Sequence, residues 1–341
     1  MFLDAALRNY DLSNVAEYAR QAEAIGFDGL WTSETAHDPF LPLGVASTAT
    51  TSLKLGTSIA VAFPRSPMIT AYTAWDLQKS SAGRFILGLG SQVRAHNQRR
   101  FSVKFESPGP KLREIVLALR AIWKCWQEGT PLHFKGAFYN FDLMTPFFNP
   151  GPIEHPGIPV YIAGVNRYMC RMAGEVCDGL HVHPFHSAKY LREYVHPAVE
   201  EGLIASGRPA KGFTYATAAF VIAGDTERER SENTEAVRQQ IAFYASTRTY
   251  EPILATHGWE GIVPELHQKS LEGDWKGMAR LITDEIIDAV AVSGTYESIG
   301  QKLRERYSGL VDRISLYQPY ELAVEPKRLA AMIRQFKVEH K

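Results

Sequence analysis

Glu34 is the first side chain in this sequence whose position suits acid–base chemistry. It follows Asp28–Ser33, a short apolar segment that reads as a buried strand, and it opens a loop that contains His37 and Asp38. A carboxylate at the end of such a strand is placed to accept a proton or a ligand's hydrogen bond. The alternative is an acid that caps a helix or forms a salt bridge, for which Asp38 is the better candidate.

Two further loops carry cationic and amide side chains. Arg65 lies within Ala62–Pro67, where two prolines fix the backbone. Such a rigid guanidinium suits a phosphate or carboxylate, and a surface ion pair is the alternative. Gln92 and His96 lie in Ser91–Arg100, a run with three arginines in a chain of zero net charge. That local charge favours an anionic ligand, and a solvated loop is the alternative.

A fourth candidate is a turn between a strand and a helix, formed by Ala163, Gly164, Val165 and Asn166. A small residue, a glycine and a helix N-terminus together expose backbone N–H groups that can bind an anion. Gly88 and Gly90 look like part of a dinucleotide-binding fingerprint, but a third glycine and a directly following helix are missing. We interpret these two glycines as close-packing and bend positions.

His181 and His183 are the only pair with the spacing of metal ligands. Residues two apart on a strand share a face, so both imidazoles are expected to point toward the same cavity. A metal-dependent hydrolase would need further ligands on other strands; His37 and His96 are available, but no second pair is visible. A metal site, a cofactor contact and a packed or capping role all stay open for these histidines.

These residues must be positioned by an alternation of strands and helices. Amphipathic segments such as Met68–Ser80 and Pro110–Trp126 keep a helical period between apolar runs. The predicted strands are Phe2–Leu7, Asp28–Ser33, a run from Leu53 up to Pro64, Gly83–Gly90, Val160–Ala163, Gly179–His183, Phe213–Ala223 and Arg313–Tyr317. Eight strands that alternate with helices in 341 residues predict an α/β fold, a (β/α)8 TIM barrel in which residues 1–341 form a single domain.

Two segments fit the repeat poorly and are predicted to be insertions. Leu132–Leu143 alternates aromatic residues around Lys135-Gly136, which indicates a hairpin. Tyr250–Asp274 is predicted to lie over the C-terminal face of the barrel, where parallel barrels carry their active sites.

Composition narrows the classes of function. Lysine plus arginine and aspartate plus glutamate number 37 each, so a nucleic-acid footprint is not indicated. Three cysteines without a CxxC pair favour buried thiols in a reducing compartment. No apolar stretch approaches the roughly 20 residues that span a bilayer, and no secretory signal is visible. We expect a cytoplasmic protein that binds neither nucleic acid nor membrane.

Four segments in their order resemble the bacterial luciferase-like flavin/deazaflavin oxidoreductase superfamily, and within it the branch that uses coenzyme F420. They are Ala22–Glu34, Leu55–Ile59, Gly83–Gly90 and Pro159–Gly164. The resemblance implies a non-proline cis peptide at Ser58–Ile59, behind the central ring of the cofactor, with Glu34 at the ring edge. The other cofactor contacts that it implies are Ser91, Gln92, His96, Ala163, Gly164, Val165, Asn166, His181 and His183.

Two positions depart from the family pattern. Thr35 stands where several relatives have histidine, which leaves His37 or His96 as the proton donor. Val165 stands where others have a second glycine, which affects the backbone geometry of the turn.

The resemblance implies an oxidoreductase that transfers a hydride between coenzyme F420 and a small organic substrate, with Glu34, His37 and His96 as catalytic residues. FMN is the alternative cofactor, with oxygen as co-substrate in a monooxygenase reaction. A non-catalytic flavin-binding or structural protein is an alternative of another class, and a metal hydrolase is a third. A homodimer is the expected assembly, because symmetric pairs are the commonest.

Overall fold

Eight parallel strands close into a barrel in the computed structural model, which describes residues 1–8, 10–318 and 326–338. Ten strands form one sheet, and eight of them make the ring once β4 and β11 are set aside. The ring closes because β10 pairs with both β9 and β12, and β12 pairs with β1. In order around the barrel the strands are β1 (Phe2–Leu7), β2 (Gly29–Thr32), β3 (Lys54–Thr57), β5 (Phe85–Gly90), β8 (Val160–Gly164), β9 (Gly179–Val182), β10 (Thr214–Ala223) and β12 (Arg313–Tyr317).

The predicted (β/α)8 barrel is confirmed, and each of its eight strands corresponds to a predicted segment. The single strand predicted from Leu53 up to Pro64 is divided, because β4 (Ala60–Val61) extends the line of β3 and pairs with β5. One short strand was not predicted. β11 (Ala291–Gly294) pairs with the outer half of β10, where Phe220 faces Ala291. This strand is too short for an alternation of buried and exposed residues to be visible in the sequence.

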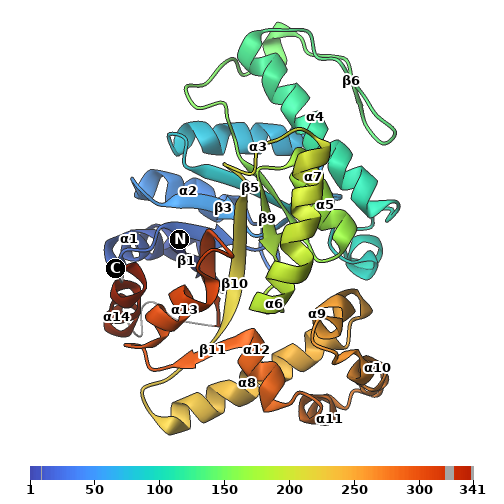
Figure 1. The fold of residues 1–341 in the computed structure, drawn as a ribbon. Helices are drawn as coiled ribbons and strands as arrows, with labels where there is room; N and C mark the ends of the chain where they lie inside the picture. Colours follow the sequence, from blue (N-terminus) through green and yellow to red (C-terminus); the bar gives the residue numbers. More distant parts are fainter. Residues whose placement is uncertain (9, 319–325, 339–341) are drawn as a thin grey trace.

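Helices surround the barrel (Figure 1). They are α1 (Val15–Ile25), α2 (Leu41–Ala49), α3 (Pro67–Ser80), α4 (Pro108–Glu128), α5 (Arg167–Val176), α6 (Ala188–Tyr190), α7 (His196–Ala205), α8 (Glu227–Ala245), α13 (Ile299–Tyr307) and α14 (Pro326–Lys337). A π-helical turn at Leu191–Val195 separates α6 from α7. Among the described residues, no helix has the length and apolar character needed to span a membrane.

Both predicted insertions are present. The first is an antiparallel hairpin of β6 (Phe134–Lys135) and β7 (Asn140–Phe141). The second begins after α8 and is larger than predicted, because helices continue beyond residue 274. It consists of α9 (Glu251–Ala255), α10 (Val263–Glu272), α11 (Trp275–Arg280) and α12 (Asp284–Val290), which lie together with α8 at the bottom of Figure 1.

The barrel interior is filled at its amino-terminal half by a buried ion pair. Arg313 Nη2 lies 2.6 Å from Asp4 Oδ1, and the Nε1–H of Trp31 donates to Asp4 Oδ2 at 2.8 Å. A Cβ on Gly29 would lie 2.7 Å from both charged groups, so glycine is needed there. Because this end is packed, the carboxyl ends of the strands are where the barrel can receive a ligand.

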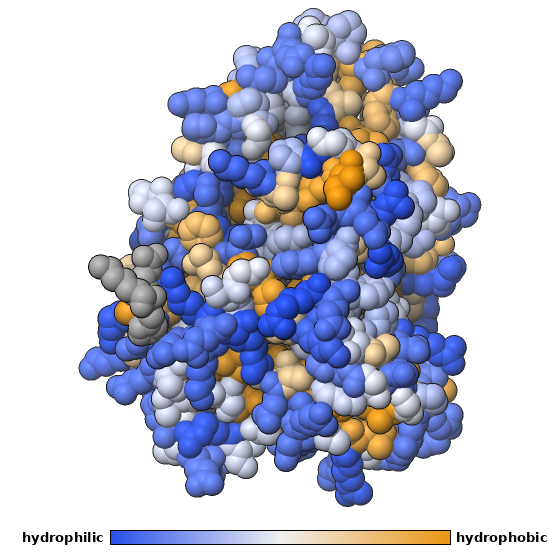
Figure 2. Space-filling model, in the orientation of Figure 1, coloured by the Kyte–Doolittle hydropathy of each residue, from blue (hydrophilic) through white to orange (hydrophobic). Residues whose placement is uncertain are grey.

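The described surface is largely hydrophilic, and its apolar residues form separate patches on the face drawn in Figure 2. Cys125, Cys170 and Cys177 are buried free thiols, as their lack of CxxC spacing predicted.

Candidate active site at the barrel mouth

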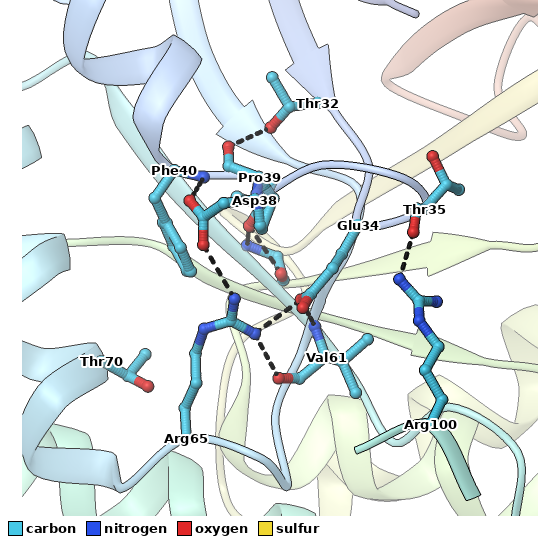
Figure 3. A network of polar contacts seen from close by, with 12 residues as sticks. Thr32, Glu34, Thr35, Asp38, Pro39, Phe40, Val61, Arg65, Thr70 and Arg100 are labelled. Carbon is cyan, nitrogen blue, oxygen red and sulfur yellow. Dashed lines mark hydrogen bonds and ion pairs between the residues drawn. The ribbon is translucent and has the colours of Figure 1, made fainter. Parts of the chain in front are cut away.

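Glu34 is held by an ion pair just beyond the end of β2. Its Oε2 accepts hydrogen bonds from Arg65 Nη1 at 2.6 Å and from the Val61 N–H at 2.7 Å. Its backbone N–H donates to the carbonyl of Ile59 at 3.1 Å. Only 6% of the Glu34 side chain is exposed, so its charge is balanced within the protein and not by water. Figure 3 shows the carboxylate enclosed by these groups.

Arg65 links Glu34 to the next acidic residue of the same loop. Its Nη2 lies 3.0 Å from Asp38 Oδ2, and its Nη1 also donates to the carbonyl of Val61 at 3.0 Å. The sequence left two partners open for Arg65, a ligand anion or an ion pair, and in this structure Arg65 pairs with two carboxylates of the protein. Asp38 Oδ1 also accepts from the backbone N–H groups of Phe40 and Leu41, just before and at the first residue of α2.

The segment after β3 brings Ser58 and Ile59 against the neighbouring strands. The Ser58 N–H donates to the carbonyl of Thr32 at 2.6 Å, and the Ser58–Ile59 peptide bond is cis. The side chain of Ile59 covers the backbone of Gly90, where a Cβ would lie 2.7 Å from Ile59 Cδ1 and 3.6 Å from Ala163. Ile59, Gly90 and Ala163 therefore lie together at the mouth.

Gly88 shows why small residues are needed in β5. A Cβ there would lie 1.8 Å from the carbonyl oxygen of Thr57 and 2.7 Å from His181 Nε2. The hydroxyl of Thr57 both donates to the carbonyl of Gly88 and accepts from its N–H. The interpretation of Gly88 and Gly90 as close-packing positions is confirmed.

The loop after β5 carries Ser91, Gln92 and His96. Gln92 adopts a left-handed conformation (φ 54°), and its Oε1 accepts from the Val93 N–H. The buried side chain of Asn97 holds this loop by donating to the carbonyls of Ser91 at 2.8 Å and Val93 at 3.1 Å. His96 is exposed at the start of a helical turn, so it can meet a ligand or exchange protons with water.

Arg100 joins this loop to the one that carries Glu34. It donates to the carbonyl oxygen of Thr35, on the opposite side of Glu34 from Arg65 (Figure 3). His37, in the same loop as Thr35, is exposed, and its ring lies 5.2 Å from that of Tyr10.

The turn after β8 presents the N-terminus of α5. Asn166 Oδ1 accepts from the Met169 N–H at 2.9 Å, which makes Asn166 the N-cap. A Cβ on Gly164 would lie 3.0 Å from Leu180 and 3.1 Å from Met169, so the turn packs closely. The carbonyl of Val165 accepts from the hydroxyl of Tyr190. The first-turn N–H groups and the helix dipole favour an anion at this position.

A cavity of about 730 Å³ lies beside this turn. Asn166 lines it together with Tyr194, Arg248 and Thr256, which belong to other elements. Tyr194 also accepts a hydrogen bond from the Arg167 N–H at 3.1 Å. The exposed Arg248 and Glu251 also line this cavity, so its lining carries one positive and one negative charge beside the helix N-terminus. The sequence did not point to Arg248, because it lies in an insertion far from the strand it meets.

His181 is buried inside the barrel and His183 is half-buried at the end of β9, and desolvation lowers the pKa of each to about 3. His181 lies edge-on to Trp31 at 5.0 Å, and its buried Nε2 has no hydrogen-bond partner among the described residues. His183 stacks on Tyr250 at 4.3 Å. Both rings are therefore neutral near pH 7. The described residues contain no group of three or more histidine, cysteine or acidic side chains able to hold a metal.

His183 has a defined proton position. Its Nδ1 accepts from the Phe185 N–H at 3.2 Å, so the neutral ring carries its proton on Nε2. That N–H group is available to a ligand, whereas an imidazolium is not present near neutral pH.

Aromatic residues that were not predicted complete the mouth. Tyr244 contacts His183 edge-on at 4.6 Å, and its hydroxyl is hydrogen-bonded to that of Tyr317. Arg8 follows β1, and its guanidinium lies 4.7 Å from the centre of the Tyr317 ring. The position of Arg8 directly after a buried strand was a signal that could have been used; Tyr244 lies within a long helix and gave none.

Comparison with known proteins identifies the family. The model of luciferase-like monooxygenases matches residues 3–313. The chain is 45% identical over 335 residues to an uncharacterized Mycobacterium tuberculosis protein, Rv1360, covering 98% of this chain and 97% of the relative. It is 27% identical over 296 residues to a 5,10-methylenetetrahydromethanopterin reductase of Archaeoglobus fulgidus, covering 84% of each. The chain belongs to the luciferase-like monooxygenase family.

Solved structures share the fold along the whole chain. The coenzyme F420 dependent tetrahydromethanopterin reductase of Methanopyrus kandleri superposes with a TM-score of 0.77 at 21% identity, covering 98% of this chain and 99% of the other. The oxygenating constituent of 3,6-diketocamphane monooxygenase of Pseudomonas putida, in complex with FMN, gives a TM-score of 0.69 at 17% identity, with both chains fully covered. Family and fold together support an oxidoreductase with a flavin-type cofactor.

Proposed function

We propose that this protein is an oxidoreductase that uses coenzyme F420 and exchanges a hydride with a small organic substrate at the barrel mouth. The observation that carries the proposal is that the ends of neighbouring strands bring Glu34, Ile59, Gly90 and Ala163 together at one opening. A deazaflavin-dependent reduction is favoured by the Methanopyrus kandleri reductase, which shares the fold and depends on coenzyme F420.

The residues present fit a flat ring with an anionic substituent. Ile59, Gly90 and Ala163 give an apolar surface without a projecting polar group, and the N-terminus of α5 lies beyond it. Arg248 adds a cation near that helix N-terminus. Ser58, Ser91, Gln92, Val165 and Asn166 are the further candidate contacts.

The bound deazaflavin would supply the hydride, and this chain would position it and manage one proton. Glu34, held by Arg65, is proposed to fix the ring edge through its remaining carboxylate oxygen, Oε1. His183 is proposed to donate a hydrogen bond through Nε2–H. His37 and His96 are exposed and are the proposed groups that exchange the proton with solvent.

FMN is the second candidate cofactor, because a relative of the same fold is known in complex with it. Its use would favour a monooxygenase reaction with oxygen. A homodimer stays a prediction.

Titration of the purified protein with F420 and, separately, FMN tests the proposal, with binding followed by the fluorescence of each cofactor. Binding of F420 with an affinity well above that for FMN supports it. Preference for FMN would replace it with the second candidate, and binding of neither would refute both.

A further inference from the structure

The segment Ser91–Lys111, between β5 and the first turn of α4, carries a local excess of positive charge. It contains five cationic side chains and one acidic one in a chain whose total charge is zero. The cations are Arg94, Arg99, Arg100, Lys104 and Lys111, and the acid is Glu106. Glu106 is already paired with Lys104 at 2.5 Å, so it does not balance the other four.

Two of these cations are held over adjoining aromatic rings. The guanidinium of Arg94 lies 5.2 Å from the centre of the Phe105 ring, and the ammonium of Lys111 lies 5.1 Å from that of Phe63. The two rings are themselves in contact, with centroids 6.0 Å apart. Lys111 also lies 5.9 Å from the ring of Tyr139, in the hairpin insertion. Because the rings adjoin, Arg94 and Lys111 are placed on one small surface.

Among the described residues, no carboxylate lies within 4.0 Å of the cationic nitrogens of Arg94 or Lys111. The nearby acidic side chains bind other groups. Glu34 and Asp38 are both bound to Arg65. Glu114, on the same helix as Lys111, accepts three backbone N–H groups of the hairpin. An aromatic ring attracts a cation without neutralising it, so the charge of Arg94 and Lys111 stays available.

This surface lies at the edge of the candidate active site. Phe63 comes two residues after the end of β4, and Arg94 comes four residues after the end of β5. Lys111 lies in the first turn of α4, which starts at the carboxyl end of the barrel. Arg100, in the same segment, is fixed to the Glu34 loop through Thr35. An anion bound by Arg94 and Lys111 would therefore be part of a molecule that enters the mouth.

We propose that Arg94 and Lys111 bind a phosphate or carboxylate group of a small molecule that occupies the barrel mouth. Its place beside the active site rests on the proposed function, but the anion site itself does not. Two sources carry this chemistry, the substrate and the anionic tail of the cofactor.

The first test measures anion binding directly, without a cofactor. Inorganic pyrophosphate and citrate are titrated into the wild-type protein and into Arg94→Gln, Lys111→Gln and the double variant by calorimetry. We expect the double variant to bind about tenfold more weakly, because two exposed ion pairs of modest strength are lost. Lys111→Arg, which keeps a cation over the rings, should retain binding.

Lys124→Gln is the matched control for this test. Lys124 lies on the same helix about 20 Å from Lys111, and its side chain is 66% exposed, so the variant removes the same charge at a distance. It should bind both anions as the wild type does. If Lys111→Gln does not fold, Arg94→Gln decides alone, because Arg94 is exposed. No binding by the wild type, or equal binding by the double variant, overturns the proposal.

The second test separates the two sources of the anion. The affinities of F420 and of its chromophore without the anionic tail are measured for the wild type and the double variant. If the double variant binds complete F420 more weakly than the wild type but binds the chromophore equally well, the site belongs to the cofactor. If the double variant binds both cofactor forms as tightly as the wild type but has lost pyrophosphate binding, the site belongs to the substrate. Failure of every cofactor to bind would refute the proposed function alone, since the pyrophosphate titration still decides the anion site.

Discussion

Replacing Arg65 with methionine should destabilise the protein by leaving a buried carboxylate without its cation. Glu34 is 6% exposed and Arg65 is 19% exposed, so the pair is far from a surface ion pair. Breaking a fully buried pair costs about 3–5 kcal/mol. Arg65 is partly exposed and the Val61 N–H still donates to Glu34 in the variant, so we expect a smaller loss, about 2–3 kcal/mol of unfolding free energy.

A double-mutant cycle tests whether that loss comes from the pair. Glu34→Gln keeps the shape of the side chain but removes its charge, and Arg65→Met in that background should cost about 1–2 kcal/mol less than in the wild type. Urea unfolding at neutral pH measures all four proteins. Arg228→Met is the control, because Arg228 pairs with Glu232 at a similar distance of 2.8 Å while 88% exposed. It should leave the urea midpoint almost unchanged, because an exposed ion pair contributes little to stability.

The reasoning is wrong if Arg65→Met costs no more than Arg228→Met, or if the effects of Arg65→Met and Glu34→Gln are additive. Cofactor binding is measured on the same variants. If Glu34 fixes the cofactor through its free oxygen, Arg65→Met should weaken cofactor binding without changing its stoichiometry.

Three further predictions concern the strands, the turn and the buried histidines. Gly88→Ala should prevent folding or cofactor binding, since its Cβ would lie 1.8 Å from the Thr57 oxygen, whereas Gly44→Ala, with open space around it, should fold normally by circular dichroism. Asn166→Asp should keep the cap of α5 but weaken the binding of the cofactor, measured by titration, about five- to tenfold, because the new carboxylate repels the cofactor's anionic group. Burial lowers the pKa of His186 from 6.5 to about 4, so the unfolded state binds its proton more readily and stability falls as pH drops below 6.5. His186→Gln should reduce the stability lost between pH 7 and pH 5, followed by urea unfolding, by about 2 kcal/mol.

The barrel could be predicted because each strand is a local pattern. Phe85–Gly90 is buried at every position and follows the helix α3, which is typical of a strand in a parallel sheet that is covered on both faces. An element of only a few residues, such as β11, has no local pattern of its own, and it becomes a strand because it pairs with a strand that is distant in sequence. The break between β3 and β4 also depends on contacts with Thr32 and Gly90, which the sequence of the segment does not contain.

The sequence predicted the position of the candidate site better than it predicted the hydrogen-bond and ion-pair partners of the site residues. Glu34, Ser58 and Gln92 stand beside strand ends, and the ends of parallel strands must meet at one face. Arg65 binds two protein carboxylates, Asp38 and Glu34, which lie 27 and 31 residues away from it in one loop, so its own segment does not reveal whether it would bind them or a ligand. Arg248 was missed for the same reason, since it lines a cavity with Asn166, which is distant in sequence. Asn97 was missed although the carbonyls that it holds, those of Ser91 and Val93, lie within six residues of it.

The balance of charge at the mouth limits which group can exchange a proton. Glu34 is neutralised by Arg65, and burial keeps His181 and His183 uncharged near pH 7. His183 can still donate a hydrogen bond, but it cannot give up a proton as an imidazolium. The exposed His37 and His96 are therefore the histidines predicted here to take part in acid–base chemistry, since water reaches both. Fixed buried groups would orient the ligand, and exposed groups on adjoining loops would carry the proton.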